Sequence, residues 1–423
     1  MNFTRRGILG LGGLAAVATV SACGSNTGLG GDSSSAGGGD QVMLTQWYHE
    51  YGEEGVKEAV ERYAAEYAGA TVEVKWTPGD YPQILGAQLL TDSVPDVFEV
   101  EQGGSLDMIR SGQLADLTAL IEPVKNDFND AVIKRFTFDG KIHGIPQTID
   151  MQLLYYRPSL LNAAGVPVPE TFEQLVAAAD AVASGEIGGF FAGNDGGIGV
   201  LSSLLIWASG HEQLNAERTE VAFLTDDFYA ALAAYRNFVN SKGFVQAASA
   251  DWFSGDAFVN GEAAMQWGGL WSLPDMLTAH GDDVGVVPFP AIGATGRLAV
   301  PFGAFGACVA AKGKHVDAAM DFVKWLWLDQ TDKQVEFSDA FGTHIPARKS
   351  LVSRATKLAD GPGAQAAAFV EQHGFANDIM WSGALGDAYS AAVSEVVKSG
   401  QDPRQAFENF AQLATAELEK LKA

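Results

Sequence analysis

The chain after residue 41 alternates between two hydrophobic periods. Short apolar runs at 42–47, 71–76 and 96–101 predict strands. Between them, apolar side chains recur at helical spacing over 53–68, and a second helix is predicted to start near Tyr81. The order strand, helix, strand, helix, strand with short connections predicts a parallel sheet.

Turn and cap signals divide the rest of the chain into further elements. A strand is predicted from Leu153, a helix from Pro158 to Gly165, and a helix to residue 183 behind a capping box at Thr171. The remaining predictions, in chain order, are a helix at 105–111, a turn at 139–141, helices at 200–209 and 225–242 (the latter capped by Gly243), strands at 284–287 and 305–310, a helix at 316–328, and mostly helix over 330–421 with breaks at 342–346, 360–363 and 401–403.

The stretch 262–271 reads as a buried strand that ends in an open corner. Gly268 and Gly269 remove side chains where another molecule or chain approaches the backbone, and Trp267 and Trp271 flank the opening. An indole has a broad apolar face and one N–H donor, which suits a sugar ring. The alternative is a glycine-relaxed strand end whose tryptophans pack in the core, where large aromatic side chains mostly lie.

The ends of the predicted parallel strands supply a second group of candidate positions. In open α/β sheets, ligands bind at the carboxyl ends of the strands. Those ends are residues 47–50, 77–81 and 101–104. Polar and aromatic side chains from all three are therefore candidates for one binding site.

Length and charge limit the classes of function. A chain of 423 residues favours two or more domains, or two lobes of one fold, and a hydrophobic content of 47% provides ample core. The formal net charge is −25, and the sequence shows no cluster of Lys and Arg. Nucleic acid and anionic lipid surfaces are therefore excluded as partners, because binding them requires basic clusters. A neutral or cationic ligand is expected.

Residues 1–23 have the pattern of an export signal. Arg5 and Arg6 precede an apolar run at 8–20, which is too short to span a membrane comfortably, and Cys23 follows Val-Ser-Ala. This ending resembles a bacterial lipobox, in which the cysteine is lipidated and becomes the first residue of the mature protein. The alternative is a cleaved signal with a chance cysteine. The arginine pair fits either a twin-arginine motif or a generic basic region.

A polar Gly- and Ser-rich linker at 24–40 follows this signal and is predicted to act as a tether. Cys23 and Cys308 are the two cysteines, so lipidation of the first leaves Cys308 without a disulfide partner. Cys308 is then expected to be a small core residue. The sequence thus predicts an exported, acidic globule that is lipid-anchored to the outer face of the cytoplasmic membrane.

The sequence lacks patterns for catalysis. The seven histidines are scattered without metal-ligand spacing, and no Gly-x-Ser-x-Gly motif occurs. The glycine loop at 193–199 has no Lys-Ser/Thr ending, which argues against phosphate binding. Carboxylates that could form a glycosidase pair are plentiful, but nothing in their spacing selects two. We therefore expect no enzyme, no cofactor and no metal, with an envelope-anchored glycoside-acting enzyme as an alternative.

Several segments, taken in this order and together with the lipobox, resemble one known family. They are Leu44-Thr45-Gln46-Trp47, Pro95-Asp96-Val97-Phe98, the stretches 112–117, 154–157, 169–175 and 258–265, and Ala318-Ala319-Met320-Asp321-Phe322-Val323. Over its whole length, the chain resembles the extracellular solute-binding lipoproteins of bacterial ABC importers, the family that includes maltose-binding and other oligosaccharide-binding proteins. Arg157 departs from the pattern, since relatives often have Asn after the paired tyrosines.

This resemblance implies an α/β, two-lobed periplasmic-binding-protein fold, with parallel-rich sheets flanked by helices and a hinge between the lobes. Lobe one would comprise 41–151 with 304–344, and lobe two 152–303 with 345–423, with crossings near 150–151, 303–304 and 344–346. The implied function is to bind a neutral di- or oligosaccharide in the cleft and deliver it, as a monomer, to the transmembrane permease subunits. A non-sugar solute such as a glycerophosphodiester is the alternative, and it would call for a cationic cleft.

The resemblance also selects candidate ligand-binding residues. Stacking is expected from Trp47, Tyr81, Trp267, Trp271 and Trp381, beside the open backbone of Gly269. Hydrogen bonds to ligand hydroxyls are expected from Glu50, Asp80, Gln102, Gln147, Asp150 and Arg348. Each acid has the alternative of being a solvated loop carboxylate or a helix cap. Trp207, Phe302 and Phe305 fit the core and the cleft equally well, and Arg348 is the one obvious cation for an anionic solute.

Overall fold

The computed structural model describes residues 42–422. The predicted export signal, the predicted lipidation site at Cys23 and the predicted linker lie outside the described residues. Within 42–422, no helix is long and apolar enough to cross a membrane.

One mixed sheet is built on the first predicted strands. Its strand order is β2-β1-β3-β12-β6. The strands are β1 (Met43–His49), β2 (Thr71–Thr77), β3 (Val97–Glu101), β12 (Phe305–Val309) and β6 (Ile145–Pro146). β1 pairs in parallel with both β2 and β3, which confirms the predicted parallel arrangement. β12 joins this sheet antiparallel to β3 from far along the chain.

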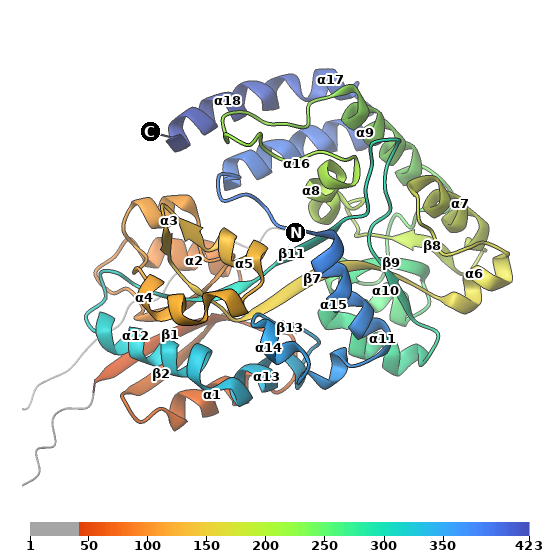
Figure 1. The fold of residues 1–423 in the computed structure, drawn as a ribbon. Helices are drawn as coiled ribbons and strands as arrows, with labels where there is room; N and C mark the ends of the chain where they lie inside the picture. Colours follow the sequence, from red (N-terminus) through yellow and green to blue (C-terminus); the bar gives the residue numbers. More distant parts are fainter. Residues whose placement is uncertain (1–41, 423) are drawn as a thin grey trace, which may run out of the picture. The chain divides into compact units, whose positions relative to one another are not determined.

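Helices and a small hairpin surround this sheet, in the lower left of Figure 1. They are α1 (Val56–Glu66), α2 (Tyr81–Gln88), α3 (Leu106–Arg110), α4 (Thr118–Ile121), η1 (Glu122–Asp127), α5 (Asp130–Arg135), the hairpin β4 (Thr137–Phe138) and β5 (Lys141–Ile142), α12 (Val316–Lys324), the π-helical turn η4 (Trp325–Asp329) and α13 (Thr331–Asp339). α1 begins at Val56 rather than at residue 53, because Gly55 before it takes a left-handed φ of 93°.

A second sheet is organised around β7 (Thr148–Tyr156), which begins at Thr148 rather than at the predicted Leu153. It follows the order β14-β11-β7-β9-β8, with β10 and β13 also paired to β7. These strands are β8 (Gly188–Phe191), β9 (Ala263–Gly269), β10 (Gly285–Val287), β11 (Val300–Gly303), β13 (Ile345–Pro346) and β14 (Gly374–Phe375). The strands missed by prediction have two to four residues each, which is too short to show a period.

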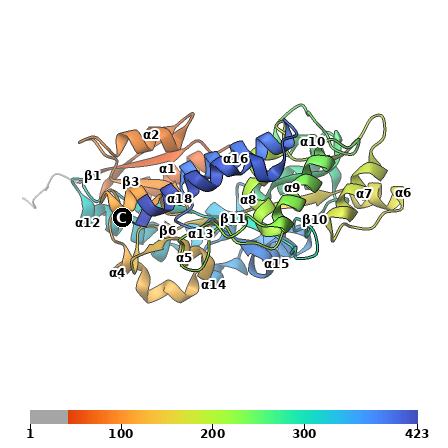
Figure 2. The ribbon, with the colours of Figure 1, turned by 90° about the horizontal axis from the view of Figure 1, so that it is seen from above.

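The helices that follow accompany the second sheet. They are α6 (Pro158–Ala164), α7 (Phe172–Val182), α8 (Ile198–Ala208), α9 (Asp226–Val239), η2 (Trp252–Ser254), α10 (Asp256–Val259), η3 (Leu270–Ser272), α11 (Leu273–His280), α14 (Lys349–Val352), η5 (Thr356–Leu358), α15 (Gly361–His373), α16 (Gly383–Val397), α17 (Pro403–Ala406) and α18 (Glu408–Lys422). α16 lies beside α8, α9 and α18, as Figure 1 and Figure 2 show. The capping box at Thr171 and the glycine cap at Gly165 are confirmed.

Gly243 is not the cap of α9, which ends at Val239 with Asn240 as its C-cap. A β-carbon on Gly243 would lie 2.6 Å from the carbonyl carbon of Ala179 in α7. The glycine therefore permits the close approach of a neighbouring helix, and it does not end α9. Cys308 is fully buried and unpaired, as predicted, and burial raises the pKa of its thiol to about 12.

The chain crosses from one sheet to the other at two places, where a single residue separates two consecutive strands. It passes from β6 to β7 at Gln147, and from β11 to β12 at Ala304. β13 pairs with the start of β7, so the segment just before Ile345 also lies at the sheet crossing near Gln147. The predicted α/β class, with two sheets flanked by helices, is confirmed.

Candidate ligand-binding cleft

A cleft made of three adjoining pockets lies where these sheet crossings meet the strand ends. The central pocket has a volume of about 440 Å³ and is lined by β7, β11, the loop after β3, one side of α8, and Trp252 and Trp271. It shares Asp150, Trp271 and Phe305 with a second pocket, and Trp207 and Asn377 with a third. The three pockets therefore form one continuous surface.

Aromatic rings line one part of the central pocket. Trp252 and Trp271 are tilted neighbours with ring centroids 6.2 Å apart. The indole N–H of Trp271 donates to the carbonyl oxygen of Phe253 at 2.9 Å, which orients the ring. Phe305 and Trp207 also line this pocket, so both are cleft residues as well as partly or fully buried ones. Phe302, the third residue for which core and cleft were equally expected, is buried and lines the pocket too.

The second pocket, of about 710 Å³, is called the acidic pocket here because of five carboxylates. These are Glu53, Glu54, Asp150, Asp256 and Asp275. His49 and His344 also line it, as do Tyr51 and Phe253. An acidic surface of this size fits the strongly negative charge of the whole chain.

His344 joins two of these carboxylates. Its Nδ1 contacts Asp150, and its Nε2 lies 3.3 Å from Glu53 Oε1. Burial acts to lower the pKa of His344, but the two carboxylates outweigh it and raise the pKa to about 10. In Glu53, burial acts to raise the pKa, whereas hydrogen bonding to His344 holds the pKa below its ordinary value. His344 is therefore a cation near neutral pH that ties β7 to the loop after β1.

His49 forms a similar pair with Glu99, a buried carboxylate of β3. The Nδ1 of His49 contacts Glu99, whose other oxygen accepts a hydrogen bond from the Tyr51 hydroxyl at 2.7 Å. Burial acts to lower the pKa of His49, yet its contact with Glu99 raises it above the ordinary value. The ring of His49 stacks on Phe305 at 4.8 Å. The His49 ring therefore packs against Phe305 where Phe305 lines the cleft.

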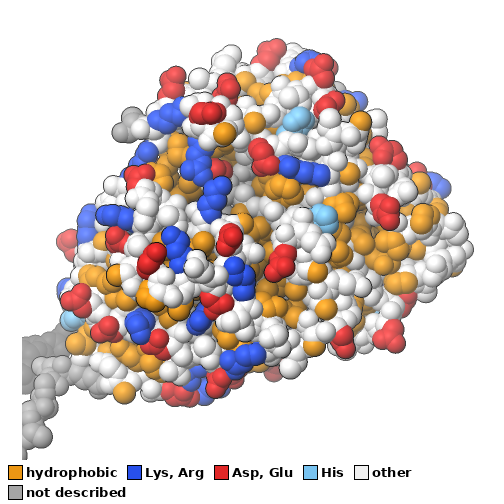
Figure 3. Space-filling model, viewed as in Figure 1, with side chains coloured by type: hydrophobic (Ala, Val, Ile, Leu, Met, Phe, Trp, Pro, Cys, Tyr) orange, Lys and Arg blue, Asp and Glu red, His pale blue; other side chains and the backbone are white. Residues whose placement is uncertain are grey.

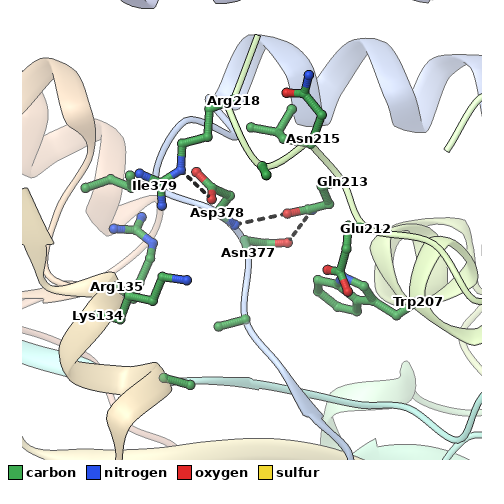
Figure 4. A pocket seen from close by; sticks show the side chains of 14 residues that line it. Lys134, Arg135, Trp207, Glu212, Gln213, Asn215, Arg218, Asn377, Asp378 and Ile379 are labelled. Atoms are coloured by element: carbon green, nitrogen blue, oxygen red, sulfur yellow. Dashed lines mark hydrogen bonds and ion pairs between the residues drawn. The ribbon is translucent and has the colours of Figure 1, made fainter. Parts of the chain in front are cut away.

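The third pocket, of about 550 Å³, is called the basic pocket and is shown in Figure 4. Lys134 and Arg135 enter it from α5. Gln213 and Arg218 come from the loop after α8, and the segment 376–379 lies between the two sides. Figure 3 shows Lys and Arg side chains on this face of the molecule, with Asp and Glu side chains among them.

Three of the predicted site residues line the central pocket: Gln102, Asp150 and Trp271. Gln102 adopts a left-handed φ of 55°, and its Oε1 is buried without a hydrogen-bond partner among the described residues. Asp150 is bonded to His344, and Trp271 is partly exposed. The structure thus brings together one candidate from each of three distant segments.

Three predicted stacking residues lie in the core. Trp267 is fully buried, donates its indole N–H to Gln152 at 3.1 Å and packs edge-on against Phe289. Tyr81 is buried with its hydroxyl bonded to the carbonyl oxygen of Glu99 at 2.8 Å. Trp47 is buried beneath Lys75. The expectation that these rings face ligand is corrected: Trp47 and Trp267 point to the covered faces of their strands, and Tyr81, at the start of α2, packs with Trp47 in the core.

Two further candidates lie outside these three pockets. Trp381 packs among Phe223, Tyr389 and Phe410. Arg348 is held by Asp127, with 2.7 Å between Nε and Oδ2, and lines none of the three pockets. Its expected role toward ligand is corrected, because this ion pair already satisfies its charge.

The remaining candidates have local structural roles or none. Gln147 is buried at the sheet crossing. Asp80 caps α2 by accepting from the N–H of Gln83 at 3.2 Å, which matches the helix-cap alternative. Glu50 is an exposed loop carboxylate. A close approach to the backbone was expected at Gly269. It is made by the indole of Trp271, a residue of the same chain, which fills the space above the glycine.

Sequence reasoning missed several residues of the cleft. They are Glu53, Trp252, Phe253, Ser203, His344 and Asn377. The adjacent aromatic pair at 252–253, between polar residues, was a signal that could have been used. Nothing local pointed to His344, since its partner Asp150 is 194 residues away in sequence.

Comparison with known proteins agrees with this architecture. The family described as Bacterial extracellular solute-binding protein matches residues 48–331. The chain therefore belongs to this family, as the sequence motifs indicated, and is an exported protein. The multiple sugar-binding protein of Streptococcus mutans is 23% identical over 58% of this chain and 62% of its own length. The matched part thus spans less than two thirds of that relative.

Another relative and two solved structures extend the comparison. The arabinooligosaccharide-binding protein of Bacillus subtilis is 23% identical over 68% of this chain and 70% of its own length. The GacH receptor of Streptomyces glaucescens, solved without ligand and with acarbose, has a TM-score of 0.76 and 22% identity over 90% of this chain and 99% of its own. An ABC substrate-binding protein of Listeria monocytogenes in complex with cycloalternan has a TM-score of 0.75 and 21% identity over 90% of this chain and all (100%) of its own. The two-lobed fold is therefore that of the sugar-binding proteins of ABC transporters.

Proposed function

We propose that this protein is the extracytoplasmic substrate-binding component of an ABC importer, and that it binds a di- or oligosaccharide in the cleft. The observation that carries the proposal is the central pocket. There the rings of Trp252, Trp271 and Phe305 line the same pocket as the polar side chains of Gln102 and Asp150. A sugar ring has apolar C–H faces and a rim of hydroxyls, so it needs both kinds of contact.

The polar groups suit hydroxyl recognition. The buried Oε1 of Gln102 has no partner within 42–422, and leaving such an atom unpaired is costly. A ligand hydroxyl would satisfy it. Asp150, fixed by His344, offers a carboxylate that strengthens hydrogen bonds from hydroxyl donors.

The protein would deliver this saccharide to transmembrane permease subunits, as a monomer held by lipid at Cys23. The lipobox-like sequence, the linker and the family of extracellular proteins support this arrangement. Lobes at 41–151 with 304–344 and at 152–303 with 345–423 would close on the ligand by a hinge. Crossing segments between the two sheets are the natural place for that hinge.

Binding without turnover is part of the proposal. The matching family and the named relatives are binding proteins. Two carboxylates, Glu101 and Asp150, line the central pocket, and Asp150 is committed to His344 as its ion-pair partner. A saccharide incubated with the protein should therefore be recovered unchanged, whereas product formation would favour the glycoside-acting alternative.

A thermal-shift screen against mono-, di- and trisaccharides tests the proposal. A ligand that binds only the folded state raises the melting temperature. The expected result is a shift with at least one neutral di- or trisaccharide and a smaller one with its monosaccharides. The absence of a shift across all saccharides, together with a shift for a glycerophosphodiester, would overturn it.

A further inference from the structure

The basic pocket contains two cations that no carboxylate neutralises. Lys134 and Arg135 form the end of α5 and point into the pocket (Figure 4). The two terminal nitrogens of Arg135 reach only the carbonyl oxygen of Gly104, each at 3.4 Å, and its Nε has no partner among residues 42–422. In that range neither side chain has a carboxylate within ion-pair distance.

The carboxylates that line the same pocket are already committed. Asp378 accepts from Arg218 at 2.9 Å, and Glu212 accepts from Arg297 at 2.6 Å. Asp378 and, more weakly, Glu101 are the acids whose charges act on the pKa of Arg135. If each of these two ion pairs is counted as neutral, the net charge of the pocket is that of Lys134 and Arg135. Lys134 and Arg135 are adjacent in the sequence, and the fold brings Arg218 to the same pocket.

The fold holds Arg135 in a poorly solvated position. Burial lowers the pKa of its guanidinium to about 10, although the charges of Asp378 and Glu101 act to raise it. The free-energy cost of removing this cation from water arises when the protein folds, and not when a ligand binds. An incoming anion would therefore gain a strong, charge-assisted interaction, and a guanidinium fork matches the two oxygens of a carboxylate or phosphate.

The basic pocket is continuous with the central pocket. Trp207 and Asn377 line both. Asn377 is held by Gln213, which donates to its Oδ1 at 2.7 Å, so the junction has a defined shape. A saccharide whose rings lie beside Trp271 can therefore extend past Trp207 toward Arg135.

We infer that the basic pocket binds an anionic substituent, a carboxylate or a phosphate, on a saccharide whose rings occupy the central pocket. This inference rests on the proposed function and widens its ligand class from neutral saccharides to acidic ones. Lys134 and Arg135 supply the charge, and Asn377 sets the junction. The sugar rings of neutral and of acidic saccharides make the same contacts in the central pocket.

Matched sugars test the inference on the full chain. Each neutral di- or trisaccharide that shifts the melting temperature is compared by calorimetry with three acidic counterparts: the reducing-end aldonate, the 1-phosphate and the non-reducing-end uronate. At least one counterpart should bind about tenfold more tightly than the neutral sugar, as one charged hydrogen-bonded contact provides. The aldonate and uronate arms distinguish a carboxylate from a phosphate. Added salt should reduce this advantage.

Charge-removing variants locate the effect. Arg135→Gln and Lys134→Gln should each reduce the ratio of the affinity for the acidic sugar to the affinity for the neutral sugar. Lys125→Gln is the matched control, because Lys125 carries the same charge on the neighbouring η1 but lies outside the pocket. Its effect on both sugars should be nil.

Two results would overturn the inference in distinguishable ways. If neutral saccharides bind but no acidic counterpart binds more tightly, or if the advantage survives in Arg135→Gln, the basic pocket is not an anion site and the proposed function stands. If neither neutral nor acidic saccharides bind, the proposed function fails and this inference fails with it.

Discussion

Trp271 lies over Gly269 so closely that a β-carbon on the glycine would come within 2.2 Å of the indole ring. The ring is thereby placed at the wall shared by the central and acidic pockets. Its neighbour in sequence, Gly268, meets nothing closer than an ordinary contact of 3.6 Å to Tyr155. The two glycines of this corner therefore have different roles, and this difference can be tested.

Trp271→Ala should weaken saccharide binding by about 2 kcal/mol or more, which is over tenfold in affinity. The free energy of unfolding should barely change, because the ring is partly exposed in the cleft. Calorimetry and denaturant unfolding measure the two quantities. Trp267→Ala is the matched control, since its indole is fully buried in the same segment and its loss should cost about 3–5 kcal/mol of stability. If Trp271→Ala instead melts far lower and still binds saccharide normally, its assignment to the site is wrong.

Gly269→Ala should displace the indole of Trp271 and weaken binding by about tenfold, approaching the effect of removing the ring. Gly268→Ala serves as the control, because an added methyl group there meets only ordinary contacts. Affinity and tryptophan emission report the displacement. Equal binding by the two alanine variants would show that the position of Trp271 does not depend on Gly269.

His344→Gln should destabilise the protein by about 3 kcal/mol near pH 6, because it leaves Asp150 and Glu53 without their shared cation. The pKa of His344 is raised to about 10 in the folded protein, above an unfolded value of about 6.5. Its contribution is therefore fully present below about pH 6.5 and is lost as the pH rises toward 10. Unfolding free energies of the wild type and the variant should converge over that range.

A control for this titration is His315→Gln, because the side chain of His315 makes no capping hydrogen bond at the start of α12. Its effect on stability should be small. A gap between wild type and His344→Gln that stayed constant from pH 6 to 10 would contradict the charged state of His344.

Cys23→Ser should move the exported protein from the membrane fraction to the soluble fraction. The reason is that the thiol is the predicted site of lipidation and the linker at 24–40 is predicted to have no other hold on the membrane. Fractionation followed by immunodetection measures the distribution. A variant that still sediments with membranes would show that the anchor lies elsewhere.

Local signals in the sequence were enough for most of the elements. Thr171 caps its helix, Gly165 ends another, and the first three long strands pair in parallel, because caps and periodicity depend on neighbours a few residues away. The short strands β11, β13 and β14 escaped prediction, since two to four residues show no period and their pairing partners are distant. The family motifs added the two-lobed arrangement, which periodicity could not supply.

The binding surface itself was decided by tertiary structure. Trp267 and Trp271 look alike in the sequence, but Trp267 pairs with Leu154 within the sheet and is buried, whereas Trp271 lies just beyond β9 and faces the cleft. His344 meets Asp150 across 194 residues. By itself, the sequence determined the elements, the acidic charge and the family; the fold alone determined which side chains share the cleft, because contacts between distant segments depend on strand register and sheet crossings.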